Sequence, residues 1–285
     1  MRRPFHSHRF LIEKPQWQIL NTEIIVNPLL KNYILFGYAA KGAIYFLIGI
    51  LAIEAAILPE RKAVGTYHAL KHLSTQPWGT IVLCILAFTL QGYILRRLLQ
   101  AIIYPGHSQS WGLTALLQRF GYIISSLSYA GVVYSALSIV LGTDKYNHTI
   151  KHVAANLLVQ PEGKWLLMIG GMMVFGVGIS YVYGAYTGSY ISNFALSNPK
   201  LEAHLKLIGK IGVATRGVTF MLIGSLIVRA FISSNSELAG GLRNAFDILS
   251  QGFLGWLWLV LLGSGFIAYG VYMFAAARYR RYVIR

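Results

Sequence analysis

The chain contains 285 residues, of which 55% are hydrophobic and only 12% are charged. Its 25 Lys and Arg residues against 9 Asp and Glu residues give a formal net charge of +16. Because soluble domains carry about a quarter charged residues, this composition excludes an ordinary water-soluble fold, a disordered chain and a nucleic-acid binder with a polar, Lys-rich surface. The single cysteine, Cys84, excludes an intramolecular disulfide framework.

Six apolar runs are each long enough to cross a bilayer, whose core of roughly 30 Å needs about 20 helical residues. They lie near residues 33–58, 78–103, 120–142, 165–191, 211–232 and 252–277. The third, fourth and sixth runs contain no Asp, Glu, Lys or Arg. The runs are continuous and do not alternate in polarity, so they indicate helices and not the strands of a barrel. The sequence therefore predicts an all-α integral membrane protein with six transmembrane helices.

Basic residues are unequally divided between the two sides that these spans define. Seventeen Lys and Arg residues fall on the side of the termini and eight on the other. By the positive-inside rule, we expect both termini in the cytoplasm. We expect a bacterial plasma membrane, or a thylakoid membrane, whose anionic headgroups meet the basic side. Residues 1–31 form a polar tail without a cleavable signal pattern, which we expect to be disordered or to lie on the membrane surface.

The spans form three repeats of two helices each. Three glycines share one position in the odd spans and three others open the even spans: Gly37, Gly121 and Gly212, and Gly79, Gly163 and Gly255. Each unit crosses the membrane twice, so all copies have the same orientation, and we expect a pseudo-three-fold bundle. We place repeat one at residues 32–106, repeat two at 107–191, and repeat three, with a basic C-terminal tail, at 192–285.

The first copy carries a family resemblance. It reads Gly-Tyr-Ala-Ala-Lys-Gly at 37–42, followed by Gln-Pro-Trp-Gly at 76–79 and Gly-Tyr at 92–93. This pattern resembles the bacterial membrane family catalogued as domain of unknown function 1206, whose members have three two-helix repeats. The resemblance covers about residues 32–280 and implies the architecture alone, since the family has no established activity. The second copy departs from it, with Ser125-Ser126 where the others have a cation and a glycine.

Polar residues at repeat-equivalent positions are the first candidates for a site. They form two sets: Lys41, Ser125 and Arg216 near the cytoplasmic ends of the odd spans, and Glu54, Ser138 and Arg229 near the opposite ends. If the odd helices line the axis, Glu54 and Arg229 form an ion pair across it, and the cations of the first set form the mouth of a solute path. In the alternative, those cations anchor helices to anionic headgroups, at about 1 kcal/mol each, while Glu54 and Arg229 snorkel.

Three further arginines lie toward the predicted cytoplasmic side: Arg96 and Arg97 within the second apolar run, and Arg119 directly before the third. The counterparts of Arg96 and Arg97 in the other copies are uncharged. A pathway that needs all three copies would not be built from such residues. We therefore assign the three arginines to contacts with phospholipid headgroups.

Histidines occur in two pairs with four-residue spacing, His68 with His72 and His148 with His152. On a helix, residues four apart share a face, which suits binding of Zn²⁺ or Cu²⁺ by two imidazoles. The alternative is that both pairs lie on the polar faces of short interfacial helices, since no cysteine or carboxylate cluster joins them.

Enzymatic signatures are absent: the sequence has no Walker loop, His-Glu-x-x-His motif, nucleophile elbow or Rossmann glycine pattern. We therefore expect no enzymatic activity and no cofactor. Two functions remain open. The first is a structural or interaction protein that binds lipids or membrane partner subunits, which the few charges within spans favour. The alternative is a transporter or channel for a small anionic or zwitterionic solute along the pseudo-three-fold axis, which the parallel repeats favour.

Overall fold

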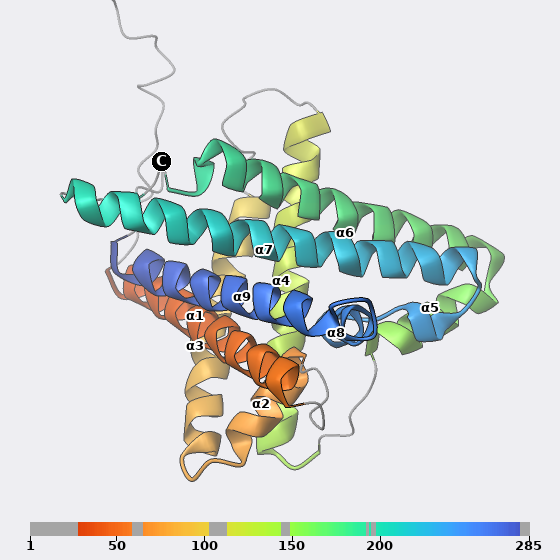
Figure 1. Cartoon of the computed structure of the whole chain (residues 1–285), viewed down its shortest axis with the longest axis horizontal. Coiled ribbons are helices and arrows are strands. Elements are labelled where there is room, and N and C mark those ends of the chain that lie inside the picture. The colour runs from red at the N-terminus through yellow and green to blue at the C-terminus, as the bar shows by residue number, and fades with distance from the viewer. Residues whose placement is uncertain are drawn as a thin grey trace, which may run out of the picture.

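The structure is a computed structural model and describes residues 28–58, 65–102, 113–143, 149–191, 194 and 198–279. Within these ranges, six helices are long and apolar enough to cross a membrane (Figure 1). They are α1 (Pro28–Ile57), α3 (Gly79–Ile102), α4 (Leu113–Val140), α6 (Pro161–Thr187), α7 (Pro199–Ile232) and α9 (Gly255–Tyr279). The predicted all-α fold with six membrane-spanning helices is confirmed. Of the predicted N-terminal tail, residues 1–27 lie outside the described residues, and α1 already begins at Pro28.

A short helix connects the two long helices of each repeat. These helices are α2 (Thr66–Ser74), α5 (Thr149–Val159) and α8 (Leu242–Ser250), and the single turns η2 (Ser189–Ile191) and η3 (Ser236–Leu238) complete the element order. We call the side of the molecule with α2, α5 and α8 the short-helix end, and the opposite side the loop end. The short helices are amphipathic: α8, for example, buries Ala245 and Phe246 beneath its polar face.

The glycines that open the even spans lie against these short helices. A Cβ atom on Gly79, Gly163 or Gly255 would lie 2.1, 2.4 or 2.1 Å from a carbonyl oxygen of the preceding short helix. The first turn of each even helix (α3, α6 and α9) therefore lies in direct contact with the backbone of the short helix before it. This close approach gives a physical reason for a glycine at the same position in all three repeats.

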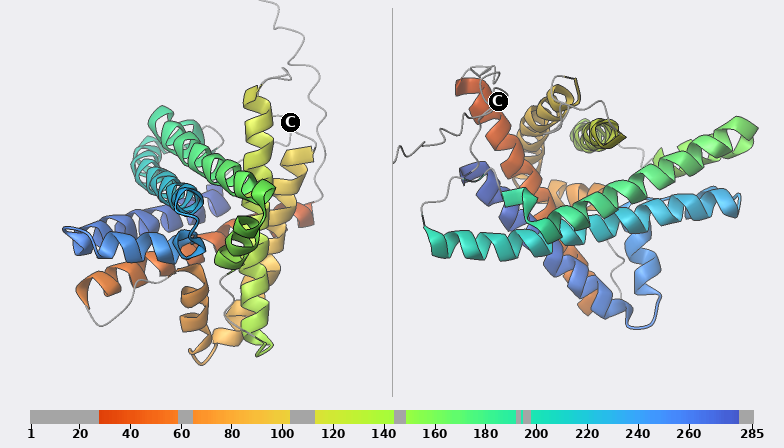
Figure 2. Two further views of the ribbon diagram at one scale, coloured as in Figure 1. Left: turned by 90° about the vertical axis from the view of Figure 1, so that its right-hand side faces the viewer. Right: turned by 90° about the horizontal axis from the view of Figure 1, so that it is seen from above.

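The even helix of each repeat packs against the odd helix of the next: α3 against α4, α6 against α7, and α9 against α1. Figures 1 and 2 show the α3–α4 pair running across the directions of the other two pairs. Glycines bring the backbones together in two pairs: Gly42 and Gly49 face Gly270 and Gly263, and Gly217 and Gly224 face Gly178 and Gly171. The equivalent residues of α4 are Ser126 and Val133. The pseudo-three-fold bundle is thus tightest along α1–α9 and α6–α7.

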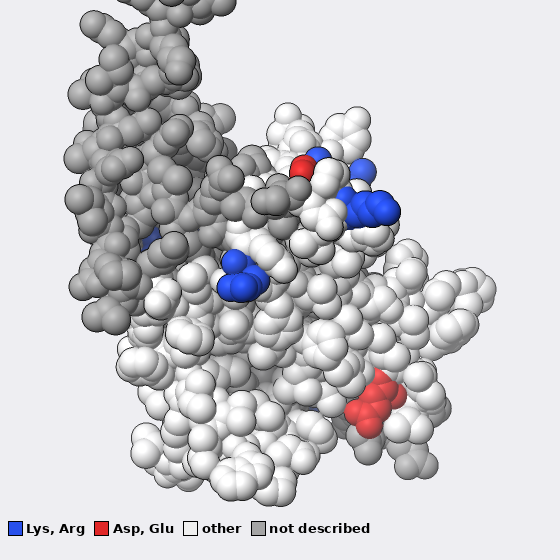
Figure 3. Space-filling model, turned by 90° about the vertical axis from the view of Figure 1, so that its left-hand side faces the viewer, with Lys and Arg blue, Asp and Glu red and all other residues white. Residues whose placement is uncertain are grey.

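The outward faces of the long helices are apolar. Phe36, Phe88 and Trp165 are each more than 60% exposed, and Figure 3 shows a largely uncharged face with isolated patches of Lys and Arg. Apolar surface of this extent marks contact with lipid or with a protein partner. Together with the length of the six helices, it defines a multi-pass membrane protein.

The start of the fifth span differs most from the sequence prediction, and the difference changes the position of a candidate residue. The fifth span was expected from residue 211, whereas α7 begins at Pro199, where the Asn198 side chain accepts a hydrogen bond of 3.0 Å from the Lys200 backbone N–H. An Asn N-cap followed by proline is a strong start signal, and it extends the helix through polar first turns. Arg216 consequently lies near the middle of α7, and not near its end.

Candidate functional site

The first set of repeat-equivalent residues is buried. Lys41, Ser125 and Arg216 are 1%, 8% and 3% exposed. Lys41 also lies near the middle of its helix, since α1 extends from Pro28 to Ile57. Burial at mid-helix does not fit the alternative in which the two cations anchor helices to lipid headgroups, because such anchors must reach the membrane surface.

Aromatic rings enclose the Arg216 guanidinium. Its Cζ atom lies 4.7 Å from the ring centre of Phe220, 4.8 Å from that of Tyr45 and 5.3 Å from that of Tyr269. Its Nη1 donates a hydrogen bond to the Tyr45 hydroxyl, which also accepts one of 3.2 Å from the Tyr129 hydroxyl. Ring faces attract a cation and partly replace its hydration. The enclosure therefore holds the positive charge of Arg216 without neutralising it.

Within the described ranges, no acidic side chain balances the charge of Arg216. Among the residues that the structure describes, no ion pair involves Arg216, and its buried Nε has no hydrogen-bond partner. The Oγ atom of buried Ser125 is likewise without a partner in the described part of the chain. A buried charge is costly unless it is paired and hydrogen-bonded. The arrangement at Arg216 is therefore complementary to an anion.

A second buried cation, Lys41, is linked to Arg97 on α3 through one tyrosine hydroxyl. The hydroxyl of Tyr93 accepts hydrogen bonds from Lys41 Nζ at 2.9 Å and from Arg97 Nε at 2.8 Å. Arg97 Nη1 also donates to Gln100 Oε1 at 3.2 Å. Sequence reasoning missed Tyr93, although the Gly-Tyr pair of the family pattern marks its position. Arg97, assigned to headgroups from the sequence, is hydrogen-bonded to side chains of α3, and its contact with headgroups stays a prediction.

The other two arginines of that assignment are also partly buried. The Cζ atom of Arg96 lies 5.3 Å from the ring centre of Tyr38 on α1. Arg119 lies at the loop end of α4. Contact of Arg96 and Arg119 with phospholipid headgroups stays a prediction.

A cavity of about 710 Å³ lies between α4 and α7 and reaches Arg216. Its inner end is formed by Arg216, Tyr45 and Tyr129, and from there it extends toward residues of α2, α5 and α8. Leu127 and Tyr134 of α4 line it although they are 67% and 73% exposed. The cavity therefore opens sideways along α4, within the apolar part of the molecule. Its volume falls in the range of pockets for small organic ligands.

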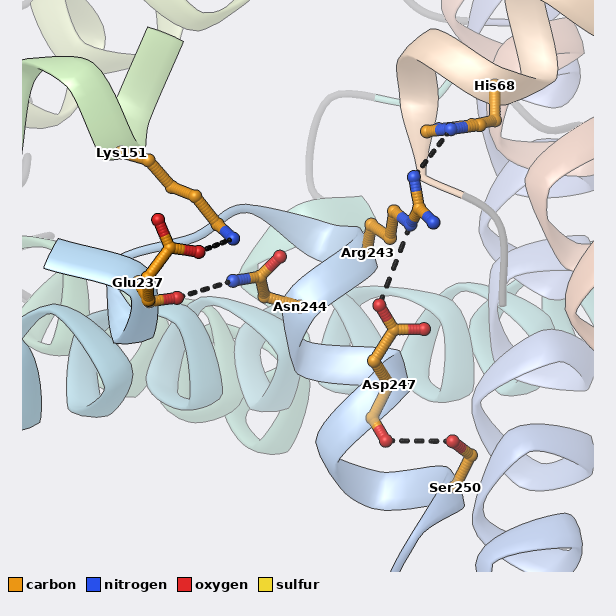
Figure 4. Close-up of polar contacts among 7 residues, drawn as sticks. All are labelled: His68, Lys151, Glu237, Arg243, Asn244, Asp247 and Ser250. Carbon is orange, nitrogen blue, oxygen red and sulfur yellow. Dashed lines mark hydrogen bonds and ion pairs between the residues drawn. The ribbon is translucent and has the colours of Figure 1, made fainter. Parts of the chain in front are cut away.

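Polar residues from all three repeats gather where the cavity meets the short helices (Figure 4). Arg243 Nη1 lies 2.7 Å from His68 Nε2, and Arg243 Nε lies 3.6 Å from Asp247 Oδ2. Lys151 Nζ and Glu237 Oε2 form an ion pair of 2.7 Å. We call these five residues the mouth cluster. Unlike Arg216, both Lys and Arg of the mouth cluster have acidic partners.

Of the four paired histidines, the structure describes His68, His72 and His152. His68 directs Nε2 to Arg243, whereas His72 and His152 are exposed, and His148 lies outside the described residues. In the described ranges, no group of three or more His, Cys, Asp or Glu side chains is placed to hold a metal ion. His68 thus belongs to the mouth cluster, and His72 on α2 and His152 on α5 are exposed, while metal binding by the histidine pairs stays a prediction.

The second set of repeat-equivalent residues does not form the ion pair considered from the sequence. Arg229 is exposed near the short-helix end of α7, and the ion pairs of the described residues include none between it and Glu54. Ser138 lines the cavity and donates a hydrogen bond of 3.0 Å to the Ser135 carbonyl. The same repeat position thus faces outward on α7 and borders the cavity on α4.

Six apolar helices in three repeats, closed around buried cations, define a multi-pass membrane protein of three two-helix units. The model of the family described as Domain of Unknown Function (DUF1206) matches residues 36–103, 120–188 and 211–280, so the chain belongs to this family and its three-repeat organisation is confirmed. The chain is similar to the uncharacterised protein YxxB of Bacillus subtilis (strain 168), with 29% identity over 250 residues that cover 86% of this chain and 89% of that protein. No solved structure matches the chain.

Proposed function

We propose that the protein binds an amphiphile with an anionic head group in the cavity between α4 and α7, and that Arg216 holds the anion. The observation that carries this proposal is the state of Arg216: it is 3% exposed, it lines the cavity, and within the described residues it has no acidic partner. Ionisable residues inside the membrane are expensive and mark functional sites. A guanidinium binds carboxylate or phosphate through two parallel hydrogen bonds.

The walls of the cavity favour an amphiphile over a free inorganic anion. Leu127, Phe220 and Ile223 line it, and its volume of about 710 Å³ far exceeds the space needed by a small ion. The sideways opening beside Leu127 and Tyr134 gives an acyl chain access from the lipid phase. The head group would then meet Arg216 while the chain stays against apolar side chains. This is the lipid-binding form of the interaction role predicted from the sequence.

Native mass spectrometry of the purified protein tests the proposal with three probes that share an oleoyl chain. Oleate offers a carboxylate, dioleoyl phosphatidylglycerol offers a phosphate, and dioleoylglycerol offers no charge. We expect the wild type to retain one or both anionic probes and to lose the uncharged one. Arg216→Gln removes the charge-assisted hydrogen bonds and lowers retention about ten-fold or more.

The matched control is Arg229→Gln, which neutralises an exposed arginine on the same helix. We expect this variant to retain the anionic probes like the wild type. Equal retention of all three probes, or equal retention by Arg216→Gln and Arg229→Gln at similar thermal stability, contradicts the proposal. A preference between oleate and phosphatidylglycerol identifies the head group.

A further inference from the structure

A second buried cation shares two tyrosine rings with Arg216. The ring centres of Tyr129 and Tyr269 lie 5.7 and 5.3 Å from Arg216 Cζ, and 5.0 and 5.3 Å from Lys41 Nζ. The two cations are therefore neighbours across these rings. An anionic group at Arg216 is attracted by Lys41 as well, and the Tyr129 and Tyr269 rings lie between the two cations.

Beyond Lys41, the cations continue toward the loop end. Arg97 follows Tyr93 by one turn of α3, which brings it about 6 Å nearer to that end. Both Lys41 and Arg97 donate to the Tyr93 hydroxyl, and the described residues include no acidic partner of Arg97. Arg97 is partly exposed, whereas Tyr93 is fully buried. Positive charge thus extends from the cavity through the centre of the molecule to the opposite side.

The series Lys41, Tyr93 and Arg97 lies within one repeat. The residues equivalent to Tyr93 and Arg97 are Val177 and Tyr181 in repeat two, and Tyr269 and Met273 in repeat three. Two repeats therefore fold with uncharged residues at the position of Arg97. Because the packing does not require an arginine there, the retention of a costly charge at this depth favours a functional role.

We propose that the anionic head group moves from Arg216 past the Tyr129 and Tyr269 rings to Lys41 and Arg97, so that the protein carries amphiphile head groups across the membrane. This inference rests on the proposed function, because it starts from the ligand bound in the cavity. The head group follows the cations, while the acyl chain remains in the lipid beside the open face of α4. The Tyr129 and Tyr269 rings lie between Arg216, at the inner end of the cavity, and Lys41.

The test uses the full-length protein in vesicles that contain phosphatidylglycerol with a fluorescent acyl chain. Dithionite, which does not cross the membrane, bleaches the outer-leaflet label, and the remaining signal reports the rate at which head groups cross. We expect wild-type protein to accelerate loss of the protected signal at least ten-fold over empty vesicles. Arg97→Gln slows this movement about ten-fold, Arg97→Lys keeps the charge and most of the rate, and Arg229→Gln matches the wild type.

Three results overturn the inference: no acceleration by wild-type protein, an unchanged rate in Arg97→Gln, or equal rates for phosphatidylglycerol and fluorescent phosphatidylcholine. The last would mean that the net charge of the head group is not sensed. Ligand retention by native mass spectrometry on the same preparation separates the two proposals. If the wild type retains anionic probes through Arg216 but moves none, translocation alone fails. If retention does not depend on Arg216, the binding proposal fails.

Discussion

Lys41 and Arg216 both lie 5.3 Å from the ring centre of Tyr269, measured from Nζ and Cζ. They occupy equivalent positions in repeats one and three, so the internal symmetry brings two cations to one ring. Like charges at this depth repel each other and lose hydration. Cation–π contacts and phenol hydroxyls reduce that cost, and an anionic ligand would reduce it further.

The Tyr93 hydroxyl is central to this compensation, because it accepts hydrogen bonds from two cations. We expect Tyr93→Phe to lower the stability of the folded protein by about 1.5–3 kcal/mol, the range for hydrogen bonds to charged groups. Thermal unfolding in detergent measures the effect. Tyr183→Phe is the matched control, since Tyr183 is 67% exposed, and it should unfold like the wild type. Equal midpoints for both variants would show that the shared hydroxyl contributes nothing.

The α6–α7 pair depends on backbone contact at glycine. A Cβ atom on Gly178 would lie 2.7 Å from the Gly217 carbonyl oxygen, whereas one on Gly176 would meet nothing within 4 Å. We expect Gly178→Ala to destabilise the protein by about 1–3 kcal/mol through overpacking. Gly176→Ala should be neutral, or stabilising by up to about 1 kcal/mol through helix propensity. Thermal unfolding of the two variants side by side decides this, and the opposite order would contradict the packing described for this pair.

Arg243 joins α2 and α8 at the cavity mouth through its contacts with His68 and Asp247. We expect Arg243→Met to loosen the mouth cluster and to increase access of water-soluble reagents to the cavity. Maleimide labelling of Ser138→Cys measures this access in a Cys84→Ser background, since Cys84 is the one cysteine of the sequence. The labelling rate should rise several-fold, with Arg229→Met as the control. A rate that does not change would show that the mouth cluster does not restrict access.

Tyr190 connects the second and third repeats and donates a hydrogen bond to the Lys206 carbonyl. Burial raises the pKa of the Tyr190 phenol above its usual value of 10.0. Because the folded state favours the neutral phenol, its contribution to stability is complete below about pH 10 and is lost as the pH rises through the raised pKa. Tyr190→Phe should therefore unfold at a lower temperature than the wild type at pH 8, and this difference should shrink above pH 10. A difference that grows with pH would contradict the assigned direction.

The architecture was predictable because continuous apolar runs and glycine spacing are local properties of the sequence. The three-fold repeat also identified Lys41, Ser125 and Arg216 as equivalent positions. The burial of Arg216 was not predictable, because the polar first turns of α7 hid twelve residues of helix before residue 211. With the true start at Pro199, Arg216 moves from a span end to mid-helix.

The cavity itself depends on helix packing that no single span reveals. Arg229 and Ser138 share one position in the repeat, yet one faces outward and the other lines the cavity. The difference arises from the unequal packing of the three helix pairs, of which α3–α4 lacks the glycine contacts of the others. The partner of His68 was likewise hidden, since Arg243 lies 175 residues away, whereas Tyr93 is only four residues from Arg97 along α3 and could have been found.

Photo-crosslinking shows whether an anionic amphiphile lies between α4 and α7 against Arg216. A photoactivatable group on the acyl chain of phosphatidylglycerol or oleate is activated in membranes, and the labelled peptides are mapped. We expect labels on less exposed cavity residues such as Tyr45, Phe220 and Ile223, which are lost in Arg216→Gln and kept in Arg229→Gln. Labels spread evenly over the outward faces of the helices, with the same pattern in both variants, would contradict it.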